Sequence, residues 1–309
     1  MKVNNLDDVE VVASFIDILR RQRERSRKRK DLSFVLPQAA NKEIPFLAAN
    51  RSKTTITWIG HATFLIQISG LNILTDPVWS NRMGFVTRLA PPGIPLSEMP
   101  EIDLVLISHN HYDHLDINSL RNIKGNPRFL VPHGLSSWLR KKGFSKVSEF
   151  NWWERDITNR VEIIFVPAQH WSRRTLWDTN QSLWGSWVVK EEGQNCGGIY
   201  FVGDSGYFRG FKEIGSSFRI DYMLVPIGAY EPEWFMSKQH VTPEEAVQAY
   251  LDVGAENVIP MHYDAFRLGD DTPEEAIHRL KKEWERRKLD PAKLKIMNLG
   301  ETLVFTNAI

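Results

Sequence analysis

The chain has 309 residues, enough for one large domain or two modest ones with a sizeable core. Hydrophobic residues make up 42% and charged residues 25%, as in ordinary globular proteins, and the formal net charge is +1. A single cysteine, Cys196, excludes an internal disulfide framework and a cysteine-rich zinc site. The polar N-terminus does not read as a signal peptide and no run of about 18 apolar residues occurs, so we expect a cytoplasmic protein.

The N-terminal segment is expected to form a helix over residues 9–30. Apolar residues recur there at helical spacing, from Val9 to Leu19. Eight Arg or Lys and one Glu lie between residues 20 and 30, so a mildly acidic body carries a short basic arm. Residues 31–53 show little periodicity and are expected to connect this arm to the body.

Strand patterns begin directly after the connecting arm. Three short runs are expected to form strands at residues 54–59, 62–69 and 72–75, with Gly70 supplying the turn between the last two. Residues 77–100 contain five prolines and are expected to form a long surface loop. Loops of this length are usually functional or disordered.

The rest of the body repeats one pattern, in which an apolar run ends and a His or Asp follows. The runs are residues 103–108, 161–166, 199–202 and 257–261, and the polar residues after them are His109, His170, Asp204 and His262. Helical patterns lie at 136–142, 243–253 and 273–288, the last two with Thr242 and Thr272 as expected N-caps. This alternation predicts stacked α and β layers with polar ligands along one edge of the sheets.

The strongest chemical signal is the stretch SHNHYDHLD at residues 108–116. Three histidines and two carboxylates fall within the eight residues from His109 to Asp116, and a packed core has no use for them. Neutral imidazole and carboxylate oxygen are the ligands of zinc, and they also suit iron or manganese. The stretch therefore predicts a centre of two metals, with the remaining ligands from His170, Asp204 and His262. The alternative is a solvated polar loop.

The HxHxDH pattern, followed at a distance by His, Asp and His, resembles that of the metallo-β-lactamase superfamily. Within it the chain is similar to the N-acyl-phosphatidylethanolamine-hydrolysing phospholipase D group, from about residue 54 to 305. The stretches that carry this resemblance are TWIGHATFLIQ, LTDPVWS, ISHNHYDHLD, WGSW, GDSGY and PIGAYEPEWFMSKQHVTPEEAV. It implies an αββα sandwich of two mixed β-sheets flanked by helices, at residues 51–309. Residues 1–50 lie outside the resemblance and are expected to form an N-terminal basic helix and arm.

The resemblance also implies a role for each site residue. The first metal would be held by His109, His111 and His170, and the second by Asp113, His114 and His262, with Asp204 bridging them. Asp76 would orient a ligand or loop through hydrogen bonds, and His240 would be a pocket residue near the metals. From its place in the GHAT turn, His61 is expected behind or at the rim of the site. Asp113 and His240 are the expected catalytic residues. The chain departs from the group at residues 263–266, where YDAF replaces WGTF.

The activity that this resemblance implies is hydrolysis of N-acyl-phosphatidylethanolamine, or a related glycerophospholipid, to phosphatidic acid and N-acylethanolamine through a metal-bridging hydroxide. Two divalent ions are expected, with Zn²⁺ favoured over iron and manganese. The chain lacks the paired HxKxxxxD motifs of the phospholipases D that form a phosphohistidine, so hydrolysis should be direct. The alternatives are a metal-dependent lactone or ester hydrolase, an RNA phosphodiesterase, and a binding protein without catalysis.

The expected partners follow from the same reading. A phospholipid is the expected substrate, and residues 9–30 offer a basic, partly apolar segment to a membrane surface. A homodimer is what the resemblance implies. Nucleic acid is not expected, although a basic arm would also suit RNA.

Overall fold

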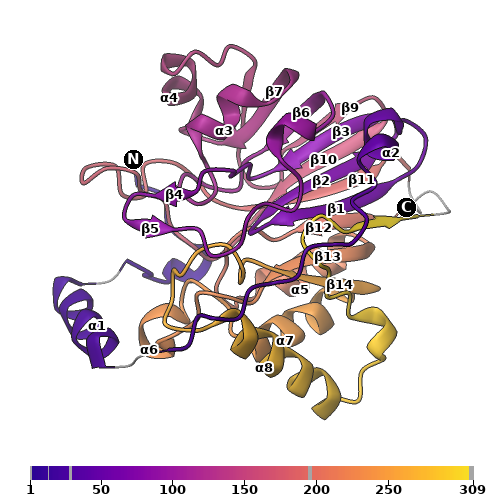
Figure 1. Ribbon diagram of the computed structural model, residues 1–309. Coiled ribbons are helices and arrows are strands. Elements are labelled where there is room, and N and C mark those ends of the chain that lie inside the picture. The colour runs from indigo at the N-terminus through magenta and orange to yellow at the C-terminus, as the bar shows by residue number, and fades with distance from the viewer. Residues whose placement is uncertain (1, 13, 28–29, 194–196, 306–309) are drawn as a thin grey trace.

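The computed structural model describes residues 2–12, 14–27, 30–193 and 197–305, so Cys196 and three positions of the predicted N-terminal helix lie outside the described residues. Its body is an αββα sandwich, in which two β-sheets pack face to face and helices cover the outer faces (Figure 1). This architecture confirms the predicted fold class. Among the described residues, no helix is both long enough and apolar enough to cross a membrane.

The first sheet has seven strands in the order β15-β1-β2-β3-β6-β7-β8. Their bounds are β1 (Thr55–Gly60), β2 (Thr63–Ile68), β3 (Leu71–Thr75), β6 (Ile102–Leu106), β7 (Gly125–Pro132), β8 (Val147–Phe150) and β15 (Thr302–Val304). Antiparallel β1, β2 and β3 confirm the three strands predicted after the arm, and β3, β6, β7 and β8 are parallel. The helices on its outer face are α2 (Ile44–Ala49), α3 (Ile117–Asn122) and α4 (Ser136–Lys141).

The second sheet has six strands in the order β14-β13-β12-β11-β10-β9. Their bounds are β9 (Arg155–Thr158), β10 (Val161–Val166), β11 (Ser186–Glu191), β12 (Gly198–Phe201), β13 (Ile220–Pro226) and β14 (Asn257–Met261). Helices α5 (Gly210–Ser217), α7 (Pro243–Val253) and α8 (Pro273–Arg286) cover it, and α6 (Glu233–Met236) precedes α7. The side chains of Thr242 and Thr272 accept hydrogen bonds from Glu245 N and Glu275 N, which confirms both predicted caps.

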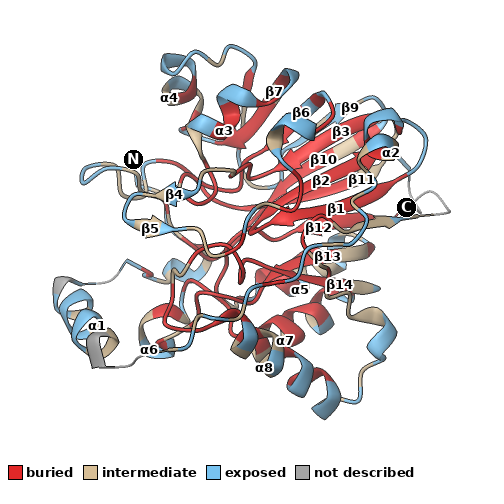
Figure 2. Cartoon of the chain, viewed as in Figure 1, coloured by how far each residue is buried: buried red, intermediate tan, exposed pale blue. Residues whose placement is uncertain are grey.

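The core lies on both faces of the first sheet because successive side chains of a strand point to opposite faces. Phe64 and Ile66 on β2 belong to the cluster between the sheets, together with Trp187 on β11. Leu65 instead packs under the outer helices, with Leu139 of α4. Figure 2 shows the central strands of both sheets as almost continuously buried, whereas the edge strands β9 and β15 are partly exposed.

Three sequence predictions need correction. The predicted helix over residues 9–30 is shorter, with α1 spanning Phe15–Arg27, because Ser14 Oγ accepts a hydrogen bond from Asp17 N and starts the helix there. The connecting arm is not free of structure, since it contains α2. The loop at residues 77–100 contains a small hairpin of β4 (Arg82–Met83) and β5 (Val86–Thr87).

The described residues also form three 3-10 helices, which are η1 (Leu6–Asp8), η2 (Leu96–Glu98) and η3 (Pro291–Lys293).

The N-terminal residues are packed against the body rather than extended from it. Leu36 is buried in the core and Leu47 of α2 is almost fully buried. The basic run faces acids of the body, with Arg25 Nε 3.4 Å from Asp270 Oδ1 and Lys30 Nζ 2.7 Å from Glu275 Oε2. The positive arm and the acidic body therefore complement each other within one chain.

Candidate metal centre

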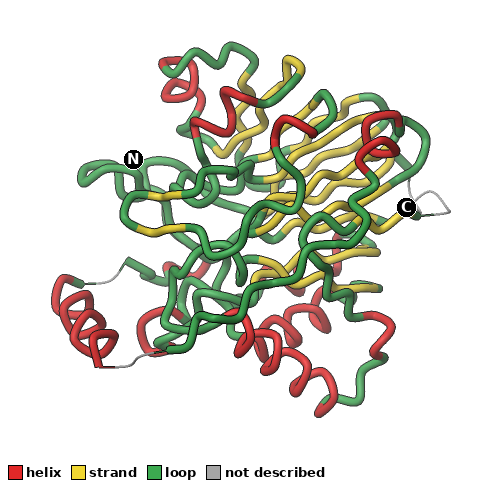
Figure 3. Tube along the Cα trace, viewed as in Figure 1, coloured by secondary structure: helices red, strands yellow, loops and turns green. Residues whose placement is uncertain are grey.

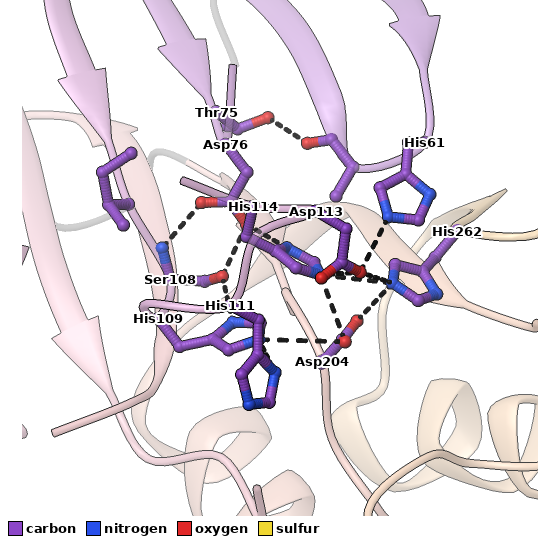
Figure 4. Close-up of polar contacts among 12 residues, drawn as sticks. His61, Thr75, Asp76, Ser108, His109, His111, Asp113, His114, Asp204 and His262 are labelled. Carbon is purple, nitrogen blue, oxygen red and sulfur yellow. Dashed lines mark hydrogen bonds and ion pairs between the residues drawn. The ribbon is translucent and has the colours of Figure 1, made fainter. Parts of the chain in front are cut away.

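The polar residues at the strand ends meet at one edge of the two sheets (Figure 4), in the region of loops that Figure 3 shows in green. The stretch from His109 to His114 follows β6, and the other three residues follow β10, β12 and β14. These three are His170, Asp204 and His262. The structure thus brings all seven predicted ligands into one buried constellation.

The first cluster consists of His109, His111 and His170. The Nε2 atom of His109 lies 2.8 Å from Nδ1 of His111, and Nε2 of His170 lies 3.2 Å from the same Nδ1 atom. All three rings offer a nitrogen within 4.8 Å of the others. The predicted grouping of these three residues agrees with this geometry.

The second cluster gathers Asp113, His114 and His262 around one carboxylate oxygen. Asp113 Oδ2 is 3.2 Å from Nε2 of His114 and 3.4 Å from Nε2 of His262. His61 joins it, because its Nε2 atom lies 3.1 Å from the same oxygen. Sequence reasoning placed His61 behind or at the rim of the site, whereas its ring directly contacts this cluster.

Asp204 lies between the two clusters, as Figure 4 shows. Its Oδ2 atom is 3.1 Å from Nε2 of His114, 3.8 Å from Nε2 of His170 and 4.0 Å from Nε2 of His109. Its Oδ1 atom is 3.1 Å from Nε2 of His262. One carboxylate therefore reaches both clusters.

The outer nitrogens of three histidines have partners that turn the rings inward. His114 Nδ1 donates to Asp76 Oδ2 at 2.7 Å, and His170 Nδ1 donates to the carbonyl of Gln239 at 3.0 Å. His109 Nδ1 lies 2.9 Å from Ser108 Oγ, which donates its own proton to Asp76. Such partners fix the tautomer and the orientation of metal-binding imidazoles. Asp76 thus lies behind His114 and Ser108, and its role at a metal stays a prediction.

Three site residues have an uncommon backbone conformation. The φ angles are 55° for His61, 33° for Asp76 and 63° for His262, all in the left-handed region that non-glycine residues seldom adopt. Backbone strain of this kind persists where the surrounding structure imposes it, and it clusters at functional sites.

Burial controls the charge of the first cluster. It lowers the pKa of His109 and of His111 well below the ordinary value, and it lowers the pKa of His170 to about 4. These rings are therefore neutral, the form that binds metals. At Asp204, burial raises the pKa but the neighbouring His114 and His262 outweigh it and hold the pKa well below its usual range.

The donor set fits divalent metal ions. In the first cluster, the nitrogens that face one another belong to rings that burial keeps neutral, and the buried Oδ1 atom of Asp204 has no partner by hydrogen-bond criteria. Buried polar atoms are normally satisfied, and unsatisfied ones call for an ion or water. Neutral imidazoles that converge with carboxylates form the typical ligand set of zinc and of related first-row metals.

A cavity of about 600 Å³ opens over the centre. Asp113, Asp204 and His240 lie on its metal side, and His240 Nδ1 is 3.8 Å from Asp204 Oδ2. Apolar residues of the N-terminal segment form another part of the wall, including Val12 and Ile18. The predicted pocket position of His240 agrees with this arrangement.

Sequence reasoning did not identify the role of Arg174. Its Nη1 atom donates to the carbonyls of Asn110 and Leu115, each at 2.8 Å, and its guanidinium lies 4.1 Å from the ring centroid of Tyr112. The side chain therefore holds both ends of the loop that carries His111 and Asp113. No sequence motif marks this role, because the acceptors are backbone carbonyls.

Asn5 is the second residue that the sequence did not single out. It lies outside the stretches of family resemblance, yet its side chain contacts the backbone of His170. A contact across 165 positions leaves no local sequence signal.

Comparison with known proteins adds independent evidence. The model of the Beta-lactamase superfamily domain matches residues 71–263. The chain is 38% identical over 232 residues to an N-acyl-phosphatidylethanolamine-hydrolyzing phospholipase D of Caenorhabditis elegans, covering 69% of this chain and 64% of that protein. It is 35% identical to a mitochondrial protein of that description from Saccharomyces cerevisiae, covering 74% and 52%. The chain thus spans less than two thirds of the length of these relatives.

A metal-dependent hydrolase of Methanopyrus kandleri is 31% identical over 80% of this chain and 98% of its own length. Among solved structures, the metallo hydrolase Igni18 of Ignicoccus hospitalis has a TM-score of 0.64 at 23% identity, covering 83% of this chain and all of that one. An isothiocyanate hydrolase from Delia radicum gut bacteria has a TM-score of 0.65 at 16% identity, covering 81% and 98%. At these identities the structural likeness shows the fold alone.

Proposed function

The chain belongs to the metallo-β-lactamase superfamily, and on that premise we propose that it is a binuclear metal-dependent phosphodiesterase acting on N-acyl-phosphatidylethanolamine or a related glycerophospholipid. Its products would be phosphatidic acid and N-acylethanolamine. The observation that carries the proposal is the pair of side-chain clusters that share the Asp204 carboxylate. Metal-dependent hydrolysis, the broader activity, is further supported by the match to a metal-dependent hydrolase over almost all of that protein's length.

The residues assigned to each metal follow the two clusters. His109, His111 and His170 would hold one ion, Asp113, His114 and His262 the other, and Asp204 both. Two divalent cations, Zn²⁺ by preference or iron or manganese, would activate water and offset negative charge that develops on phosphorus-bound oxygens.

Two residues of the chain are assigned to the chemistry itself. Asp113 faces the cavity and would orient the attacking water and accept its proton. Burial lowers the pKa of His240 to about 3, so its ring is neutral and offers an N–H to an oxygen of the substrate phosphate. His61 contacts Asp113 Oδ2 and would hold that carboxylate in place.

The apolar part of the cavity wall supports a lipid substrate. Val11, Val12 and Ile18 of the N-terminal segment face it, as do Phe235 and Leu268 of the body. Such a wall suits an acyl chain beside a phosphodiester that lies at the metals. The wall also contains Arg21, Arg173 and Arg174 and the rings of Tyr112 and Trp171, which are residue types that RNA sites use, so the substrate test below includes an RNA.

Segments that line this cavity or the pocket beside it also carry exposed apolar side chains, and these support contact with a membrane surface. Ile16 and Leu19 of α1, Phe85 of the β4–β5 hairpin, and Leu176 and Trp177 are exposed. These segments lie on one side of the molecule in Figure 1 and Figure 2. We propose that this side contacts the bilayer, which extends the expected contact of residues 9–30 to two further loops.

The membrane proposal is tested by flotation with vesicles of phosphatidylcholine and phosphatidylglycerol. The double variant Phe85→Ser/Trp177→Ser should lose vesicle binding, whereas Ile157→Ser, an exposed apolar residue of β9, should not. Equal binding by all three chains would contradict the proposal.

The substrate proposal is tested with three substrates given to the zinc-loaded chain: N-acyl-phosphatidylethanolamine in vesicles, a lactone and an RNA oligonucleotide. The expected result is turnover of the phospholipid alone, abolished in Asp113→Asn. Turnover of the lactone or the RNA alone would transfer the assignment to that substrate class. The homodimer that the resemblance implies stays a prediction.

A further inference from the structure

The side chain of Asn5 pairs with both backbone polar groups of His170. Asn5 Nδ2 donates to the His170 carbonyl at 2.9 Å, and Asn5 Oδ1 accepts from the His170 N–H at 2.9 Å. The same oxygen accepts from Trp184 Nε1 at 3.0 Å, and Nδ2 donates its second proton to the carbonyl of Val9 at 3.0 Å. Every donor and acceptor of the buried amide is thus used.

The pairing requires an amide at this position. Only Asn and Gln carry a donor and an acceptor side by side, as the peptide group of His170 demands. Gln is one methylene longer and would move the amide within a buried site, whereas Ala would leave the N–H and the carbonyl of His170 without these partners.

The N-terminal segment is anchored on both sides of Asn5. The N–H of Val3 donates to the carbonyl of Asn180 at 2.9 Å. Asp7 accepts two hydrogen bonds from Arg209 Nε, at the start of α5, at 2.8 and 3.0 Å. Leu6 packs against the core between the sheets. These contacts fix the place from which Asn5 reaches His170.

His170 needs such support because it lies four residues beyond the end of β10 (Val161–Val166), outside the strand ladder. Its ring is oriented by Gln239, which sets the direction of Nε2 toward His111 and Asp204. Its backbone is held by Asn5. The two contacts together determine where the Nε2 atom lies.

We propose that Asn5 is a positioning residue for His170, through which the docked N-terminal segment gives the cluster of His109, His111 and His170 its full metal affinity. The inference rests on the proposed binuclear centre. Residues that orient a metal-binding histidine typically contribute roughly 10- to 100-fold to metal affinity. The second cluster has no contact with Asn5 among the described residues, so its affinity should not depend on it.

The test is a Zn²⁺ titration of the metal-free full chain in competition with a chelator. Wild type should bind two ions, and Asn5→Ala should bind one ion within about two-fold of wild type and the other roughly 10- to 100-fold more weakly. Asn4→Ala is the matched control, because the Asn4 amide contacts Asp8 Oδ1 at the surface and should leave both affinities unchanged. Selective loss of one site also separates positioning from general unfolding, which would weaken both.

Arg209→Ala gives a second variant, since it removes the exposed ion pair with Asp7, and with it an exposed pair to Glu213 of α5, without changing a buried residue. It should weaken the same single site by a smaller factor, roughly two- to five-fold. Unchanged affinities in Asn5→Ala, or equal losses at both sites, would overturn the role of Asn5 while leaving the binuclear centre in place. Failure of the wild-type chain to bind two ions would overturn the centre and the role of Asn5 together.

Discussion

Asp76 Oδ2 accepts a 2.7 Å hydrogen bond from Nδ1 of His114, and this bond leaves Nε2 of His114 facing the Asp204 carboxylate at 3.1 Å. Both side chains are fully buried. Asp76 also accepts from the backbone N–H of Ser108 at 2.7 Å, one residue before the metal-binding stretch. One carboxylate thus fixes both the start of that stretch and the tautomer of a histidine within it.

Asp76→Asn should therefore weaken metal binding. The amide keeps the shape of the side chain but removes the negative charge that receives the His114 proton, so we expect roughly 10- to 100-fold lower Zn²⁺ affinity and kcat/KM. Metal content at fixed free Zn²⁺ is the measurement. Asp103→Asn, which also alters a carboxylate bonded to a backbone N–H, is the control. Equal losses in both variants would show that Asp76 has no specific role at the metals.

Arg174 should be irreplaceable by lysine. Its Nη1 atom donates to the carbonyls of Asn110 and Leu115 while the guanidinium plane lies over Tyr112, and an ammonium has no plane to stack on that ring. We expect Arg174→Lys to lose at least about 1 kcal/mol of stability and to bind metal more weakly. Urea unfolding and metal titration are the measurements. Arg173→Lys, in the next position, should leave the stability near wild type, and a similar loss there would contradict this assignment.

The metal-free chain should lose stability in acid. Burial lowers the pKa of His170 to about 4 and those of His61 and His240 to about 3, against 6.5 for an ordinary histidine. The unfolded chain therefore binds more protons than the folded one once the pH falls below 6.5, and the free energy of unfolding falls from about pH 6.5 to pH 4. Each histidine adds a slope of up to about 1.4 kcal/mol per pH unit.

Urea unfolding of chelator-treated protein at a series of pH values measures this slope. His240→Gln should reduce it, because one of the histidines that burial keeps neutral no longer titrates. A free energy of unfolding that stays constant over this window would show that the histidines are not held neutral by burial.

Ethanol should not divert the reaction. Enzymes that pass a phosphatidyl group through a covalent histidine transfer it to alcohols, whereas direct attack by water leaves no such species. Incubation with ethanol should therefore yield phosphatidic acid without phosphatidylethanol, as measured by lipid mass spectrometry. Detection of phosphatidylethanol would contradict direct hydrolysis.

The sequence predicted the parts of the molecule that local patterns encode. Val161–Val166 and Asn257–Met261 are strands with the predicted bounds, because continuous apolar runs signal buried strands. Asp204 could be proposed as a ligand because it follows such a run. The actual start of α1 was also readable, since Ser14 and Asp17 have the spacing of a capping box.

Long-range contacts with backbone groups could not be predicted. Asn5 forms hydrogen bonds with the peptide group of His170, and Arg174 donates to carbonyls of the metal-binding loop. Every residue carries the same backbone groups, so a sequence does not show which of them a distant side chain will contact. The direct contact of His61 with Asp113 was missed for a related reason. It depends on the left-handed backbone of His61 in the turn after β1, and the residue type gives no indication of that conformation.

The most direct test of the proposed function is mass spectrometry of the products formed from N-acyl-phosphatidylethanolamine by the zinc-loaded chain in ¹⁸O-labelled water. The account predicts phosphatidic acid with one ¹⁸O atom in its phosphate and unlabelled N-acylethanolamine, with neither product in Asp113→Asn. Label in a released fatty acid, or no product from a chain that holds two metals, would contradict it.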